Sequence, residues 1–234
     1  MPFFLNHREP HLTEWMDRPD CDSVKLFNTY RQFNTINKLL SGWKMIFKEY
    51  LKPIIEANSG SAAILDIGCG GGDILQYLDQ ICRQEGFQVS FTGTDPDPRA
   101  KNFFEENCDR NQIRFINKTS EELVEEGSRF DIVISNHLIH HLQDDEILAL
   151  CRASEKLSKK LVLFNDIERS DFGYGLFALT TPLLFRNSFI SADGKLSIRR
   201  SFRKDELQTL IPDSWSVKRK FPFRLLAIHE SRNS

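Results

Sequence analysis

Residues 63–73, Ala-Ile-Leu-Asp-Ile-Gly-Cys-Gly-Gly-Gly-Asp, decide how the rest of the chain is organised. A short apolar run passes through a carboxylate into a glycine-rich turn, and apolar residues at helical spacing begin behind it at Ile74. This order predicts a strand, a tight turn and a helix. We expect Asp73 to cap that helix and to complement its dipole. The glycines at 68, 70 and 72 allow a sharp turn and a close approach of the backbone to a ligand.

Strands and helices alternate beyond this turn. Strands are predicted at 61–66, 88–95, 113–116, 130–135 and 161–164, and helical segments at 73–84, 98–108, 121–126 and 144–157. A helix at 204–211 and two final strands at 215–220 and 223–230, one of them reversed, complete the pattern. The rhythm is typical of an α/β fold with a doubly wound, mostly parallel sheet of seven strands.

Two segments lie outside the alternation. Residues 1–58 form an N-terminal arm followed by two predicted helices, which either pack on the sheet or lie across the ligand pocket as a lid. Residues 59–234 form the Rossmann-like domain, with an insertion at about 170–200 that shows no clean periodicity. Because the insertion follows the fifth strand, we expect it beside the carboxyl ends of the strands, where such folds bind ligands.

Composition excludes several classes of protein. The 234 residues are 40% hydrophobic and 27% charged with a net charge of −2, as in an ordinary globular domain. The five cysteines form no CxxC motif, which indicates a reducing compartment, and no apolar run reaches the roughly 18 residues of a membrane helix. We therefore expect a cytoplasmic protein with no membrane span. Residues 195–234 are locally basic, but a solvated face explains them more simply than nucleic acid.

Polar residues end several of the predicted strands. Asp66, Asp95, Asn117 and Asn136 should meet at one edge of the sheet, around the crevice beside the first strand. Asp95 follows the glycine turn at the distance where a carboxylate accepts hydrogen bonds from ribose hydroxyls, and Pro96 stiffens its surroundings. Carboxylates on both sides of the turn would repel a pyrophosphate but suit an ammonium group and a sulfonium. This favours S-adenosylmethionine over a dinucleotide.

The same motifs resemble those of a known family. Residues 64–72 resemble motif I of the class I S-adenosylmethionine-dependent methyltransferases, residues 93–98 their acidic second motif, and residues 130–142 their fourth motif with its His-His-Leu ending. Residues 30–42 weakly resemble the N-terminal helix of ubiquinone/menaquinone C-methyltransferases. Residues 165–169 are similar to small-molecule methyltransferases of bacterial polyketide or quinone pathways.

The resemblance implies roles for particular residues around the cofactor. Gly68 and Gly70 would approach its methionine half, Asp66 would fix its amino group, and Asp95 would bind the ribose. Tyr30 and Arg31 would close over it, with Arg31 pairing its carboxylate. The family's usual acidic residue for adenine is absent, which leaves Asn117 or Thr119 for that role. The full cofactor-binding set is Tyr30, Arg31, Asp66, Gly68, Gly70, Gly72, Asp95, Pro96, Asn117, Thr119 and Asn136.

Candidate catalytic residues are His140 and Asp166, with Glu168 as a rival base. A base is needed only if the acceptor must lose a proton, because methyl transfer depends mainly on positioning. His137, His140 and His141 could share a helical face, but no further Cys or carboxylate stands at ligand spacing, so we expect no metal. The product of the cofactor would be S-adenosylhomocysteine.

The acceptor is predicted to be a small aromatic or lipophilic molecule, such as a phenol, a quinone-like compound or a polyketide. Phe172, Tyr174 and Phe185 are candidate walls of its pocket, although packing in the core would explain these aromatic residues equally well. Two alternatives stay open. One is an RNA or protein methyltransferase that docks through the basic C-terminal segment, and the other is a protein that binds S-adenosylmethionine without catalysis.

Overall fold

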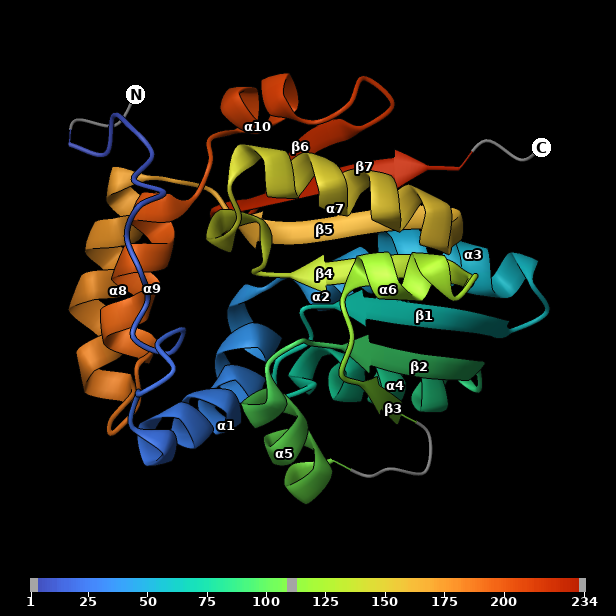
Figure 1. Cartoon of the computed structure of the whole chain (residues 1–234), viewed down its shortest axis with the longest axis horizontal. Coiled ribbons are helices and arrows are strands. Elements are labelled where there is room, and N and C mark those ends of the chain that lie inside the picture. Colours follow the sequence, from blue (N-terminus) through green and yellow to red (C-terminus); the bar gives the residue numbers. More distant parts are fainter. Residues whose placement is uncertain (1–3, 109–112, 232–234) are drawn as a thin grey trace.

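A computed structural model describes residues 4–108 and 113–231 of the chain. The fold is built on one mixed sheet. Its strands are β1 (Ser61–Ile67), β2 (Gln88–Thr94), β3 (Ile113–Ile116), β4 (Phe130–Asn136), β5 (Ser158–Ile167), β6 (Ser216–Lys220) and β7 (Arg224–Glu230). They lie in the order β3-β2-β1-β4-β5-β7-β6, and β7 alone runs antiparallel to its neighbours (Figure 1). The predicted seven-stranded, mostly parallel sheet is confirmed.

Helices cover both faces of the sheet and one of its ends. In chain order they are α1 (Ser23–Leu40), α2 (Trp43–Ile46), η1 (Phe47–Leu51), α3 (Lys52–Ala57), α4 (Asp73–Glu85), α5 (Pro98–Asn107), α6 (Ser120–Glu125), η2 (Ile139–His141), α7 (Asp144–Leu157), α8 (Asp171–Leu184), α9 (Ile190–Arg200) and α10 (Lys204–Leu210). The predicted second helix spans α2 to α3, with one π-helical turn, η1, in its middle. The break before it falls at Gly42, whose φ of 75° is left-handed.

Alternate residues of each strand supply two hydrophobic cores. Ile64 and Ile132 belong to the core shared with α2, α3 and α4, whereas their neighbours Leu65 and Val133 belong to the core shared with α6, α7 and α10. This alternation follows from the period of two in a strand. Burial on both faces is what a mostly parallel sheet requires, and it explains why the central strands are continuously apolar.

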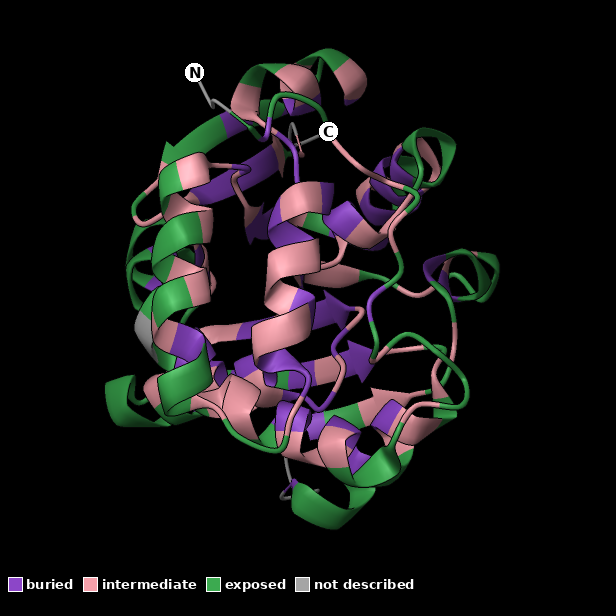
Figure 2. Cartoon of the chain, turned by 90° about the vertical axis from the view of Figure 1, so that its left-hand side faces the viewer, coloured by how far each residue is buried: buried purple, intermediate pink, exposed green. Residues whose placement is uncertain are grey.

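Residues 170–200 form two ordered helices instead of an irregular insertion. Figure 1 shows α8 and α9 at the end of the sheet where the parallel strands terminate, and in Figure 2, which looks onto this end, they stand in front of the buried strand ends. Phe177 of α8 packs onto Gly194 of α9, where a Cβ atom would collide with its ring. The side chains of Leu179 and Leu183 are about three-quarters exposed. Because α8 is apolar on its outer as well as its inner side, it lacks the one-sided pattern that predicts a helix.

The helices before β1 could either pack on the sheet or cover the ligand pocket, and different helices do each. Tyr30 of α1 lines the cavity described below, whereas Trp43 and Ile46 of α2 are buried in the core of the sheet. Within the described residues, no helix is long and apolar enough to cross a membrane. The division of the chain at residue 58 stays a prediction.

Candidate functional site

The glycine turn after β1 is tied to the end of the neighbouring strand. The amides of Gly68 and Cys69 both donate to the carbonyl oxygen of Thr94, at 2.8 and 3.1 Å. The amide of Gly70 donates to Oδ2 of Asp95 at 3.0 Å. Gly70 has a φ of 50°, a conformation that other residues rarely adopt, so the tight turn depends on glycine.

Asp95 lies at the centre of this arrangement. Its second carboxylate oxygen accepts from the amide of Asp97 at 2.9 Å, so two backbone donors hold the side chain in place. Asp95 and Pro96 both line the cavity. Burial raises the pKa of Asp95, while the Asp97 and Gly70 amides counter that shift by stabilising the carboxylate.

Two more carboxylates lie behind the turn. Asp66 is 1% exposed, and neither of its carboxylate oxygens has a hydrogen-bond partner within the described chain. Burial, with the nearby charges of Asp73 and Asp95, raises its pKa well above the usual range. An unpartnered buried carboxylate is costly unless a donor or a cation approaches it. The site therefore favours a cationic ligand at this end.

The expectation that Asp73 caps α4 is wrong. Gly72 occupies the N-cap position, and no side chain makes a capping hydrogen bond there. Asp73 is instead the first helical residue, where its charge complements the dipole, and Oδ2 accepts from the side-chain amide of Asn37 at 2.9 Å. Burial raises the pKa of Asp73 to about 6.

One cavity of about 720 Å³ connects the turn with the helices that cover it. Its polar end contains Gly68, Gly70, Asp95 and Asn136. Its opposite wall is largely apolar and comes from α1, α8, α9 and the turn between β6 and β7, with the residues Phe33, Ile36, Leu40, Leu176, Phe177, Leu184, Phe185, Ile190, Ile198, Pro222 and Phe223. A pocket of this size and lining suits small organic ligands.

The N-terminal arm (residues 4–22) closes one side of the cavity. The amides of Trp15 and Met16 donate to the two carboxylate oxygens of Asp193 in α9, at 2.8 and 3.0 Å. Glu9 pairs with Arg199 at 2.7 Å. Burial raises the pKa of Asp193 to about 6. These bonds bring Glu14 and Asp17, which sequence reasoning missed, to the wall of the cavity.

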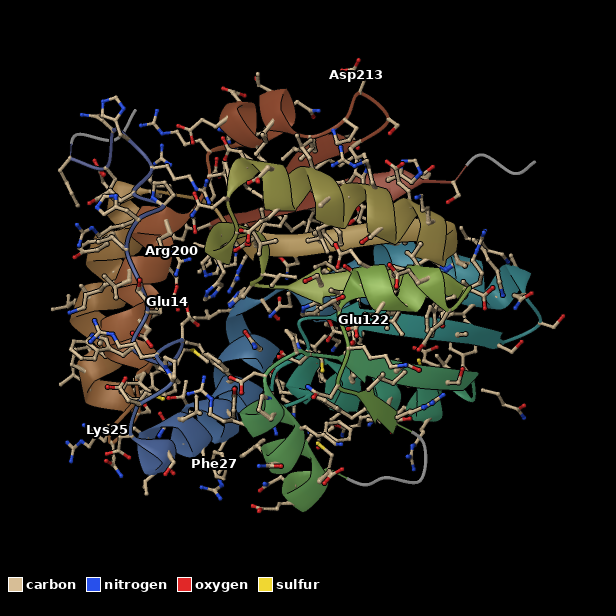
Figure 3. All side chains as sticks on the ribbon, viewed as in Figure 1. Glu14, Lys25, Phe27, Glu122, Arg200 and Asp213 are labelled. Carbon is tan, nitrogen blue, oxygen red and sulfur yellow. The ribbon has the colours of Figure 1, made fainter. Side chains whose placement is uncertain are left out.

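Four elements supply a buried group of charged side chains. Nδ1 of His140 in η2 lies 2.6 Å from Oδ1 of Asp166 in β5, and Nε2 lies 3.4 Å from Oε1 of Glu14. Figure 3 shows Glu14 near Arg200 of α9, and the two charged groups lie 3.7 Å apart. Burial opposes a charge on His140, but Asp166 and Glu14 outweigh it and raise its pKa to about 9. His140 is therefore held as an imidazolium at neutral pH.

The predicted site residues separate into three groups. Tyr30, Gly68, Gly70, Asp95, Pro96, Asn136, His140, Phe185 and the rival base Glu168 line the cavity. Asp66, Gly72 and Asp166 do not line it but stand directly beside residues that do. The rest, Arg31, Asn117, Thr119, Phe172 and Tyr174, are not part of the cavity lining.

Three side chains that were expected to bind the cofactor do not line the cavity and have other partners. Arg31 is exposed, bonds to Asn28 and lies over the ring of Phe103. Thr119 caps α6 by accepting from the amide of Glu122, and it therefore faces its own helix. Asn117 donates to the backbone oxygen of Asp95 at 2.7 Å. Their cofactor roles stay predictions that this geometry does not support.

Two of the three residues expected to form pocket walls, Phe172 and Tyr174, do not line the cavity. The side chain of Phe172 is 73% exposed and packs against Phe223 on the outside of the cavity. Tyr174 packs edge-on against Phe4 of the arm, with ring centroids 5.5 Å apart. Both residues belong to the first turn of α8, whose inner face is carried by Gly173, Leu176 and Phe177 instead.

Residue 137 holds an unusual backbone conformation where β4 ends. His137 has a φ of 61°, which costs a non-glycine residue about 1–3 kcal/mol. Its Nε2 meets Nη1 of Arg224 from β7. Burial and the neighbouring guanidinium lower the pKa of His137 well below its ordinary value, so the ring is neutral and accepts that hydrogen bond. Arg224 carries no sequence signal beyond standing at the start of an apolar strand.

Comparisons with known proteins agree with this geometry. Residues 64–160 match the methyltransferase domain family. Over 126 residues the chain is 32% identical to the ubiquinone biosynthesis O-methyltransferase of Azorhizobium caulinodans, a match that covers 53% of the chain and 47% of the relative. The chain thus spans about half the length of the curated relative it matches.

Solved structures share the fold. The plantazolicin methyltransferase BpumL, in complex with SAH, superposes with a TM-score of 0.65 at 14% identity and covers 93% of each chain. The plantazolicin methyltransferase BamL gives 0.61 at 19% identity, covering 87% of this chain and 73% of that one. The magnesium protoporphyrin IX methyltransferase of Synechocystis PCC 6803 gives 0.52 at 12% identity, with coverages of 93% and 91%.

Residues 64–160 match a methyltransferase domain, and the fold and the glycine turn are those of class I S-adenosylmethionine-dependent methyltransferases, as the motifs predicted. The methyltransferase domain itself occupies residues 64–160 of the chain, and S-adenosylmethionine is the cofactor of this class.

Proposed function

We propose that this protein transfers the methyl group of S-adenosylmethionine to a hydroxyl oxygen of a small acceptor with an apolar body. The observation that carries the proposal is the single cavity of about 720 Å³, which joins the carboxylate-rich glycine turn to the apolar wall of α8 and α9. One end fits a cationic nucleoside and the other fits an aromatic or lipophilic molecule. A cavity that holds both ligands supplies the proximity on which methyl transfer depends.

The residues at the polar end fit the cofactor. Two amides hold the carboxylate of Asp95, which would accept from the ribose hydroxyls, and the unpartnered oxygens of Asp66 suit the ammonium group or a water that it binds. When bound, S-adenosylmethionine supplies a methyl carbon on a sulfonium, which leaves as a neutral thioether. The carboxylates of Asp66, Asp73 and Asp95 favour that positive charge.

The acceptor end provides a route for the proton. A hydroxyl acceptor that gains a methyl group must release its proton, and His140 is the base we propose, oriented by Asp166 at 2.6 Å. Nε2 of His140, the nitrogen that would take the proton, faces Oε1 of Glu14 at 3.4 Å. Because the pKa of His140 is raised to about 9, transfer should accelerate as the pH approaches that value.

The related proteins support a small acceptor. The names of the relatives refer to ubiquinone biosynthesis, to plantazolicin and to magnesium protoporphyrin IX. The RNA or protein alternative loses its main support because basic side chains of the C-terminal segment pair within the fold. Arg199 binds Glu9, Arg219 binds Glu168, and Lys220 binds Glu49. The unpaired cysteines support our proposal of a reducing, cytoplasmic location.

The direct test supplies S-adenosylmethionine with a panel of phenols, hydroxyquinones and polyketide-like acceptors and measures S-adenosylhomocysteine and methylated product by mass spectrometry. Asp95→Asn should weaken binding of S-adenosylhomocysteine by about 10- to 100-fold, because charge-assisted hydrogen bonds to ribose are lost. The exposed Asp213→Asn is the matched control. Unchanged affinity in Asp95→Asn would refute the ribose role. Tight cofactor binding without turnover on any acceptor would favour the non-catalytic alternative.

A further inference from the structure

Arg224 brings a positive charge into a cavity whose other charged groups are mostly acidic. Among the described residues, it is the only lysine or arginine that lines this cavity. The side chain is 7% exposed, at the start of β7 and next to Phe223 and Pro222 of the apolar wall. A buried guanidinium requires a structural reason or a ligand.

The partners of Arg224 leave its charge uncompensated. Nε donates to the carbonyl oxygen of Leu40 at 3.1 Å, where α1 ends, and Nη1 donates to Nε2 of His137. Both acceptors are neutral, since burial and Arg224 itself keep His137 unprotonated. Nη2 has no hydrogen-bond partner in the described part of the chain, and this atom is not fully buried.

The carboxylates of Asp166 and Glu168 interact directly with other residues and not with Arg224. Asp166 receives the ring and the backbone amide of His140, and Glu168 pairs with Arg219 at 2.6 Å. Within the described residues, no carboxylate lies within 4.0 Å of the Arg224 guanidinium. Asp166 acts on it only at longer range, and although burial lowers the pKa of Arg224 to about 10, the guanidinium stays charged at neutral pH.

We propose that Arg224 is an anion subsite and that the methyl acceptor carries a carboxylate, which Nη2 binds while the apolar body of the acceptor packs on Phe223 and α8. This inference rests on the proposed function, because it names a chemical feature of the acceptor for the same cavity. A carboxylate there would compensate the charge and use the free donor, and hydrogen bonds between guanidinium and carboxylate are among the strongest in proteins.

A carboxylate could also come from the methionine half of the cofactor, and binding measurements separate the two sources. The probes are 4-hydroxybenzoate and its neutral counterpart 4-hydroxybenzamide, titrated calorimetrically into the full chain saturated with S-adenosylhomocysteine. We expect the wild type to bind the benzoate about tenfold more tightly than the benzamide, the ratio that one charge-assisted interaction supplies. Equal affinities in the wild type would overturn the proposal without any variant.

Arg224→Gln should bring the benzoate to benzamide ratio close to one while leaving the affinity for S-adenosylhomocysteine within about twofold. Arg224→Lys keeps a charge and should restore part of the preference. The exposed Arg114→Gln on β3 is the matched control and should behave as the wild type does. Circular dichroism and thermal melting confirm that each variant is folded.

Two outcomes would overturn the acceptor assignment. The first is a benzoate preference that survives in Arg224→Gln. The second is a selective loss of S-adenosylhomocysteine affinity in Arg224→Gln, with 5′-methylthioadenosine, which lacks the amino acid half, binding unchanged; this would assign Arg224 to the cofactor. Failure of the proposed function is distinguishable, because it would show as an absence of methyl transfer while the carboxylate preference persists.

Discussion

Oε1 of Glu14 lies 3.4 Å from Nε2 of His140, so the imidazole stands between this carboxylate and that of Asp166. Glu14 comes from the N-terminal arm and His140 from the loop after β4. Both side chains are about 2% exposed. The arm thus reaches the centre of the site and, together with Asp166, raises the pKa of the proposed base.

The pH dependence of stability should report this contact. The pKa of His140 is about 9 in the folded chain against 6.5 in the unfolded chain. Its contribution is therefore complete below pH 6.5 and is lost as the pH rises through about 9. The free energy of unfolding in urea should fall over that window. His140→Gln should remove the decline and destabilise the fold by about 3–5 kcal/mol, the cost of breaking a buried ion pair.

Asp166 should affect the pH dependence of stability at the acidic end of the range. Burial would raise the pKa of this carboxylate, but His140 outweighs burial and lowers it below 3.8. The stabilisation is present above pH 3.8 and is lost as the pH falls through the depressed pKa. A free energy of unfolding that stays constant from pH 6 to 10 in the wild type would contradict the proposed charged pair.

Glu14→Gln should shift the pH profile of methyl transfer. Removal of one of the two carboxylates lowers the pKa of His140 below 9, because the imidazolium loses part of its stabilisation. The midpoint of kcat/KM against pH should therefore move to lower pH, and the His140 resonance should titrate with it in NMR. Glu9→Gln, which removes only the pair with Arg199, is the control for loosening of the arm. An unmoved midpoint in Glu14→Gln would separate Glu14 from the base.

Alanine substitutions at the two glycines that flank α4 should distinguish the cost of a steric collision from the cost of backbone strain. Gly72 and Gly86 flank α4 with φ values of 75° and 78°. A Cβ at Gly72 would stand 2.6 Å from the ring of Phe104, whereas one at Gly86 would meet nothing within 4 Å. Gly86→Ala should cost about 1–2 kcal/mol from the left-handed conformation alone. Gly72→Ala should cost about 1–3 kcal/mol more, because the core is overpacked. Equal costs in urea unfolding would show that Phe104 moves freely.

Chelation should leave the protein unchanged. Glu14, His140 and His141 place one ligand atom each within 4.8 Å of one another, a spacing that a metal ion can use. Oε1 of Glu14, however, already accepts from the hydroxyl of Ser197 at 2.8 Å and faces Arg200. The hydroxyl and the guanidinium therefore compensate the negative charge of Glu14 without a metal ion. Dialysis against EDTA should keep S-adenosylhomocysteine affinity and methyl transfer within about twofold. A loss that Zn²⁺ or Co²⁺ restores would contradict the prediction that no metal is needed.

The sequence by itself determined the sheet and the polar end of the cavity, where the cofactor is proposed to bind. Residues 63–73 and Asp95 are recognisable because their signals are local: glycines in a turn, a carboxylate at a strand end, and helical spacing behind it. The carboxyl ends of parallel strands necessarily meet at one edge. Local patterns are therefore sufficient to predict that Asp95 and Asn136 lie at the same edge, and both line the cavity.

Only the tertiary structure decided the apolar end of the cavity, where the acceptor is proposed to bind. Glu14 and Arg224 carry no periodic signal, because each acts through contacts with segments far away in the chain. Phe172 and Tyr174 do not line the cavity, and the sequence does not indicate this, because α8 is apolar on both its inner and outer sides. Charge pairing and the choice of a buried face depend on how helices and arm pack together, and that information is distributed over the whole chain.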